Sequence, residues 1–189
     1  MAAEPPAESS VALASAFSAA DVRRVLSERG WLDVNGENPG NDVDSAMEAW
    51  LGRASQLLGP HAADRGQLAG LLALVFHYDA RALLEERENQ AVLTRAGARE
   101  VVRQLANRVL DGGDVDSDRF KEIIDGMKAA LPYRGRTLFH PIRLALAGRP
   151  GEGELDRVIL LLDPAAKLGF AERPKGSRQR MVEFCAALD

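Results

Sequence analysis

Residues 133–162 read YRGRTLFHPIRLALAGRPGEGELDRVILLL, and this stretch decides the fold we expect for the whole chain. A basic lead-in runs into apolar residues with helical spacing, and Gly148 then ends that run. A second apolar run with the same spacing begins near Glu154. The stretch therefore predicts two consecutive helices joined by a short loop at residues 149–153.

The same periodicity recurs on both sides of this stretch. Ser18 and Asp21 have the spacing of a capping box, and Asp79 and either Asp116 or Ser117 stand where helices would begin. The ranges with helical spacing are 18–29, 43–58, 62–76, 96–110 and 117–131, with a further helix after Asp79 and another at 177–188. A packed helical bundle explains these apolar stripes without any function.

Composition agrees with helices and limits the kinds of site. The hydrophobic fraction is 46%, mostly Ala and Leu, and aromatic residues make up only 5%. A lone cysteine, Cys185, excludes an intrachain disulfide and a cysteine-built zinc site, so a cytoplasmic location is the default expectation. No apolar run approaches the roughly 20 residues that cross a bilayer, and we expect neither a signal peptide nor a membrane partner.

Charge is distributed unevenly along the chain. Residues 1–126 carry 13 basic and 21 acidic side chains, whereas residues 127–189 carry 11 basic and 7 acidic ones. The overall net charge of -4 argues against a protein that coats nucleic acid generally. The C-terminal part is therefore the one that we expect to approach a phosphate backbone.

Residues in the opening stretch resemble the C-terminal part of glutamyl-tRNA synthetases. That family has a Leu-Phe-x-Pro-Leu-Arg-x-Ala-Leu-Thr-Gly helix followed by a Gly-Pro-Glu-Leu-type turn. The matching residues are Leu138, Phe139, Pro141, Ile142, Arg143, Ala145, Leu146, Ala147 and Gly148, then Gly153, Glu154 and Leu155. Two departures are Ala147, where the family has a hydroxyl, and Glu152-Gly153, where a residue followed by Pro is common.

The resemblance extends more weakly from about Trp31 to about Phe170. It implies an all-α fold, a helical bundle of two small helical subdomains like those that hold the anticodon arm of tRNA. We expect residues 1–17 to be a disordered tail, 18–131 an N-terminal helical part and 132–189 a C-terminal anticodon-binding-like part. Residues 171–189 have no counterpart that we can assign.

The signatures of a class I catalytic domain are absent. There is neither a His-x-Gly-His-like turn nor a Lys-Met-Ser-Lys-Ser-like loop, and the three histidines, His61, His77 and His140, stand apart from one another. We therefore expect no metal, no cofactor and no catalytic residue in this sequence. Whether the chain serves an enzyme stays open, because the family it resembles is a ligase.

RNA contact by the basic C-terminal part is the functional prediction that remains. We expect the loop from Arg149 to Leu155 to lie near unstacked anticodon bases, because RNA sequence is read mainly in single strands. The predicted tRNA-binding residues are Arg134, Arg136, Arg143, Arg149, Glu152, Gly153, Leu155 and Lys167. Further basic candidates are Arg173, Lys175, Arg178 and Arg180. Equally open is that these side chains solvate helix surfaces, and that Arg143 holds a neighbouring helix through a carboxylate.

Two functions from different classes follow. The first is a module that recognises the anticodon arm, with glutamate tRNA as its expected partner, working beside a separate glutamyl-tRNA synthetase catalytic subunit or as a fragment of a full ligase. The second is a helical protein-interaction module that kept the fold and lost tRNA binding. A continuous basic face would favour the first, and scattered charge with an exposed apolar patch would favour the second.

Overall fold

The structure is a computed structural model that describes residues 17–32 and 41–188. Within these ranges every regular element is a helix, so the all-α prediction is confirmed. The helices are α1 (Ala19–Glu28), α2 (Asn41–Leu58), the 3-10 turn η1 (Gly59–His61), α3 (Arg65–Phe76), α4 (Ala80–Glu85), α5 (Arg87–Leu93), α6 (Ala98–Leu110), α7 (Ser117–Ala130), α8 (Gly135–Ala147), α9 (Glu154–Ala166) and α10 (Ser177–Leu188).

The caps predicted from the sequence are confirmed. Ser18 and Asp21 form a complete capping box at the start of α1. Asp79 accepts hydrogen bonds from two backbone N–H groups of α4, and Asp116, of the two candidates Asp116 and Ser117, caps α7 by accepting one from Arg119. Short polar side chains therefore fix where these helices begin.

Some expectations differ from the structure or lie outside it. The periodicity did not predict α5, which is a separate short helix because the backbone turns to an extended conformation at Glu86. The expected tail, apart from residue 17, lies outside the described residues.

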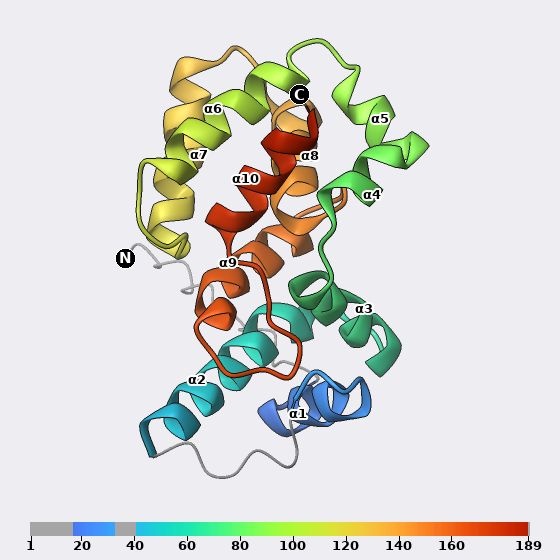
Figure 1. The fold of residues 1–189 in the computed structure, drawn as a ribbon, viewed down its shortest axis with the longest axis vertical. Helices are drawn as coiled ribbons and strands as arrows, with labels where there is room; N and C mark the ends of the chain where they lie inside the picture. Colours follow the sequence, from blue (N-terminus) through green and yellow to red (C-terminus); the bar gives the residue numbers. More distant parts are fainter. Residues whose placement is uncertain (1–16, 33–40, 189) are drawn as a thin grey trace, which may run out of the picture.

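Figure 1 shows how the helices are arranged. Helices α1, α2 and α3 lie together at one end, while α4 to α8 and α10 form the other end. Helix α9 runs between them and packs against α2, α3 and α8. One helix thus contributes to the packing of both ends.

Aromatic rings hold the α1–α3 end together. Trp31 stacks on Phe76 with ring centroids 4.8 Å apart, and Phe170 meets Phe76 edge to face at 5.1 Å. Phe170 belongs to the connection between α9 and α10, and the next residue, Ala171, donates a backbone hydrogen bond to Trp31 at 2.9 Å. The α9–α10 connection therefore reaches into the first end before α10 packs into the second (Figure 1).

The buried apolar residues form one continuous cluster with members from 18–131 and from 132–189. Helix α6 precedes residue 131 and α8 follows it, and the two helices pack closely on each other. The expected division into two parts at residue 131 stays a prediction. No helix in the described residues combines the length and the apolar character that crossing a membrane requires.

Candidate nucleic-acid interface

A surface cavity of about 330 Å³ lies between α3 and the turn that joins α8 to α9. The α3 side contributes Gln67 and Gly70, with His61 from the preceding 3-10 turn. The other side contributes Arg149 and Glu154. A cation, a carboxylate, an amide and an imidazole thus surround a space that is open to solvent.

The backbone at Gly148 directs Arg149 to this cavity. Gly148 has φ of 87°, a left-handed conformation that glycine adopts without strain, and its N–H donates to the carbonyls of Arg143 and Leu144. Helix α8 therefore stops sharply, and the chain reverses into the turn. Arg149 is exposed there and forms no ion pair within residues 17–32 and 41–188.

Arg143 fixes the shape of the turn from inside. Its Nε and Nη2 donate to the two carboxylate oxygens of Asp156 at 2.8 and 2.9 Å, and its Nη1 donates to the carbonyl oxygen of Gly151 at 2.6 Å. The guanidinium also lies 4.9 Å from the ring centroid of Phe139. Such a bidentate pair is among the stronger hydrogen-bonding arrangements in proteins. Of the two open alternatives for Arg143, the structure shows the carboxylate contact.

The other predicted residues of the turn differ in exposure. Arg136 and Glu152 pair across it at 3.2 Å with side chains that are 76% and 67% exposed, so water screens their attraction. Gly153 is also exposed. Leu155 is fully buried, and its side chain therefore offers no surface to RNA in this structure.

His140 adds a titratable group beside these cations. Partial burial lowers its pKa below 6.5, and the nearby guanidinium groups of Arg95 and Arg136 lower it further. Its Nε2 atom has no hydrogen-bond partner among the described residues. The lowered pKa favours the neutral imidazole, and the positive charge around it comes from arginines.

Arg134 lies away from the turn and completes the end of α7. Its guanidinium donates to the carbonyl oxygens of Lys128 and Leu131, both at 2.7 Å, and to that of Tyr133 at 2.6 Å. A cation at a helix C-terminus satisfies carbonyls that lack helical partners and interacts favourably with the helix dipole. This role is sufficient to explain an arginine at this position.

Lys167 lies at the opposite end of α9 from the turn. Thirteen helical residues separate the two, which corresponds to about 20 Å at 1.5 Å per residue. Lys167 is paired with Asp114, and the hydrogen bond to that carboxylate raises the pKa of Lys167. The structure thus brings together Arg136, Arg143, Arg149, Glu152 and Gly153, but not Arg134 or Lys167.

The further basic candidates near the C-terminus are largely engaged within the protein. Lys175 pairs with Glu183 at 2.6 Å, and Arg178 donates to the carbonyl oxygen of Leu110. Arg180 is fully buried. Arg173 is exposed.

Sequence reasoning missed His61 and Gln67 as neighbours of Arg149. They precede it by more than 80 residues, and nothing in their local pattern distinguishes them from ordinary surface positions. Glu154 lay within the predicted loop but was noted only as the start of α9. Only the packing of α3 against α9 brings these side chains to one cavity.

The described chain is thus an all-helical domain in which Arg143 holds a surface turn in place beside an open polar cavity. The family model "Anticodon binding domain" matches residues 19–166, which is most of the chain, and the chain therefore belongs to this family. The match confirms the resemblance found in the sequence. It ends before α10 begins.

Curated relatives agree with this assignment. The chain is 26% identical over 132 residues to glutamate–tRNA ligase 2 of Syntrophus aciditrophicus (strain SB), covering 67% of this chain and 25% of that protein. It is 30% identical over 112 residues to glutamate–tRNA ligase of Sulfurihydrogenibium sp. (strain YO3AOP1), covering 59% and 22%. The chain spans about a quarter of the length of these relatives. No solved structure matches it.

Proposed function

We propose that this chain binds the anticodon arm of a tRNA, with glutamate tRNA as the preferred partner, through the α8–α9 turn and the adjoining cavity. It contributes recognition in cytoplasmic aminoacylation, while the ligation is carried out by a separate catalytic subunit or by other parts of a larger ligase. Membership of the anticodon binding domain family and similarity to two glutamate–tRNA ligases support this proposal.

The single observation that carries the proposal is the exposed Arg149 at the edge of the cavity. Its guanidinium has five donors and no competing carboxylate pair among the described residues, so it is available to a phosphate or to a base edge. Gln67 and Glu154 line the same cavity and supply amide and carboxylate groups. Unstacked bases are recognised by hydrogen bonds of this kind on their edges.

The test is tRNA binding by the purified chain across a salt series. Arg149→Glu should weaken binding of glutamate tRNA at least tenfold and reduce the slope of log K against log salt by about one, because one phosphate contact is lost. Lys121→Glu is the matched control, because Lys121 is exposed on α7 and carries the same charge change. This control should lower affinity less than threefold.

An unrelated tRNA tests specificity in the same assay. Preference for glutamate tRNA that is reduced in Arg149→Glu supports recognition at the turn. Equal weakening by both charge reversals would mean that the tRNA responds only to net charge. No binding near physiological salt would overturn the proposal for the isolated chain.

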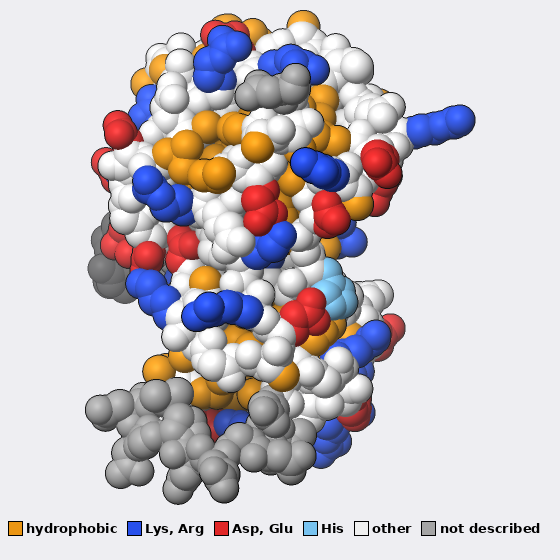
Figure 2. Space-filling model, viewed as in Figure 1, with side chains coloured by type: hydrophobic (Ala, Val, Ile, Leu, Met, Phe, Trp, Pro, Cys, Tyr) orange, Lys and Arg blue, Asp and Glu red, His pale blue; other side chains and the backbone are white. Residues whose placement is uncertain are grey.

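A second candidate, the helical protein-interaction module, is favoured by one surface. On the face that Figure 2 shows, Lys and Arg side chains are interspersed with Asp and Glu, while hydrophobic side chains gather over α6 and α10. Val182 of α10 is 51% exposed, and among the described residues it is the one large hydrophobic side chain that is exposed to solvent rather than buried or half-buried. Val182→Asp should leave tRNA affinity unchanged if the first proposal is correct.

A further inference from the structure

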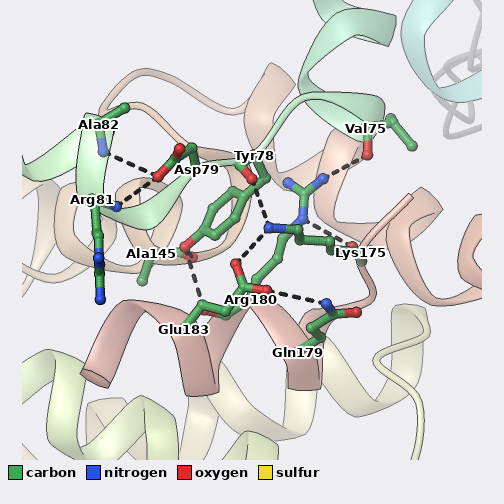
Figure 3. Close-up of polar contacts among 10 residues, drawn as sticks. All are labelled: Val75, Tyr78, Asp79, Arg81, Ala82, Ala145, Lys175, Gln179, Arg180 and Glu183. Carbon is green, nitrogen blue, oxygen red and sulfur yellow. Dashed lines mark hydrogen bonds and ion pairs between the residues drawn. The ribbon is translucent and has the colours of Figure 1, made fainter. Parts of the chain in front are cut away.

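Arg180 of α10 is completely buried and lacks a carboxylate partner in the part of the chain that the structure describes. It instead donates three hydrogen bonds to backbone carbonyl oxygens. Nη2 reaches Val75 at 2.6 Å, Nη1 reaches Leu146 at 2.8 Å and Nε reaches Lys175 at 2.9 Å. Figure 3 shows the guanidinium directed towards Val75 beside the ring of Tyr78.

The positions of these carbonyls explain how a charge is tolerated there. Val75 is in the last turn of α3, and Leu146 is in the last turn of α8. The C-terminal ends of both helices carry partial negative charge and carbonyls without helical partners. Burial lowers the pKa of Arg180 to about 10, so the group remains charged at neutral pH. Two helix ends thus take the place of a carboxylate.

Of the two helices that Arg180 joins, α3 forms one wall of the cavity, and α8 leads into the turn that carries Arg149 on the opposite wall. Helix α3 carries Gln67 and Gly70, which line it, two turns and one turn before Val75. Helix α8 ends at Ala147, one residue after Leu146, and the chain then passes through Gly148 to Arg149 on the opposite wall. Arg180 is therefore bonded from inside the protein to the helix that carries one wall and to the helix that leads into the other.

Neighbouring contacts reinforce the same junction. Tyr78 donates its hydroxyl to the carbonyl oxygen of Ala145 at 2.6 Å, and its ring centroid lies 4.6 Å from the guanidinium carbon of Arg180. Lys175 donates to the backbone carbonyl of Tyr78 at 3.0 Å and pairs with Glu183 (Figure 3). The linker between α3 and α4 is thereby fixed to α10.

We propose that Arg180 is a positioning residue that sets the spacing between the α3 wall and the α8–α9 turn, and so holds the cavity ready for an unstacked base. The proposal rests on the proposed function for the identity of the ligand. The spacing itself is a property of the free protein and can be measured without RNA. Helix α10 lies beyond the residues that the family model matches, so this device is not contained in that match.

The first experiment measures the wall spacing directly in the full chain. Spin labels are attached to cysteines introduced at Ala63, just before α3, and at Glu152 in the turn; both positions are exposed, and Cys185 is replaced by Ser. Arg180→Met is compared with Phe184→Ala, a change one turn along α10 at another fully buried side chain. Phe184 cannot hydrogen-bond to either wall, so it controls for general loss of core packing.

Arg180→Met should shift or broaden the distribution of distances between the two labels, whereas Phe184→Ala should leave this distribution as it is in the parent protein. Both variants are measured at temperatures where circular dichroism shows that they are folded. An unchanged distribution in Arg180→Met, or equal changes in both variants, overturns the proposal. If Arg180→Met does not fold, Arg180→Lys replaces it, because a lysine keeps the charge but cannot reproduce the planar fork across three carbonyls. The lysine variant should also broaden the distribution.

Binding of glutamate tRNA to the unlabelled variants then links spacing to recognition. Arg180→Met should weaken it about tenfold, and Phe184→Ala less than threefold, while both are folded. Equal losses in the two variants overturn the positioning role. If the parent chain binds no tRNA, the proposed function fails, and the label distances still decide whether Arg180 sets the spacing.

Discussion

Basic residues lie in or beside the connections on both sides of α9, but the two connections use their charges differently. In the α8–α9 turn, Arg143 is tied inside to Asp156, and Arg149 is left outside beside the cavity. After α9, Lys167 pairs with Asp114 and Lys175 with Glu183. The density of basic residues therefore overestimates the number of cations that a nucleic acid can reach.

The difference follows from where each connection runs. The turn caps α8 and projects at the surface, whereas the α9–α10 connection crosses from one end of the molecule to the other (Figure 1). Along that route Phe170 enters the aromatic cluster, and Ala171 bonds to Trp31. A segment that joins two packed regions uses its polar groups to hold them, so fewer remain for a partner.

The largest stability effect should come from the second connection and its helix. Arg180→Met removes the donor from two buried carbonyl oxygens and one part-buried carbonyl oxygen, and each unsatisfied buried group costs about 1–3 kcal/mol. We expect a loss of roughly 3–5 kcal/mol in the free energy of unfolding, measured by urea denaturation. Arg178→Met, at an exposed arginine of the same helix, should cost less than about 1 kcal/mol. Similar losses of unfolding free energy in both variants would contradict the expectation that the buried Arg180 stabilises the protein more than the exposed Arg178.

The inner pair of the turn should follow. Asp156→Ala leaves the guanidinium of Arg143, whose side chain is 9% exposed, without its carboxylate. The expected loss is about 3 kcal/mol, because an unpaired buried charge keeps its desolvation cost. Asp114→Ala, at the exposed pair with Lys167, should cost less than about 1 kcal/mol. If urea denaturation showed a larger loss of unfolding free energy for Asp114→Ala than for Asp156→Ala, the expected order of the two ion pairs would be wrong.

A smaller effect is expected at the half-exposed pair of the second connection. Glu183→Gln keeps the size of the side chain and removes the charge opposite Lys175, whose side chain is 32% exposed. Water screens this pair, so the loss should be about 0.5–1 kcal/mol. Measuring unfolding at low and high salt checks the cause, because the difference from the parent should shrink as salt rises.

The smallest effect concerns pH and His140, beside the turn. Because the pKa of His140 is lowered in the folded state, the unfolded chain binds the proton more readily. Its contribution to stability is complete above the unfolded pKa of 6.5 and is lost as pH falls from there towards the folded pKa. His140→Asn should make the decline of thermal stability below about pH 6.5 shallower. An equally steep decline in the variant would exclude His140 as a source.

Local patterns predicted the helices well because their causes are local. Ser18, Asp79 and Asp116 cap helices through side chains that bond within three residues, and Gly148 ends α8 through its own backbone conformation. The α8–α9 turn was predicted at its correct place for the same reason. Helix α5 was missed because Glu86 interrupts a run whose composition does not signal a break.

The candidate site was predicted only in part. The loop from residue 149 to 155 was expected to face a ligand, and the structure exposes Arg149 beside a cavity. Leu155 was included because of the resemblance, yet the first turn of α9 directs it into the core. His61 and Gln67 had no signal, because their position beside Arg149 depends on how α3 packs on α9.

By itself, the sequence determined that this chain is helical, where its helices are capped, and that it resembles the anticodon-binding region of a synthetase. These properties depend on residues within one or two helical turns of each other, so they can be seen in the linear order. Only the tertiary structure decided which arginines are available. Arg180 meets a carbonyl 105 residues earlier in the chain, and a contact at that separation exists only after the helices have packed.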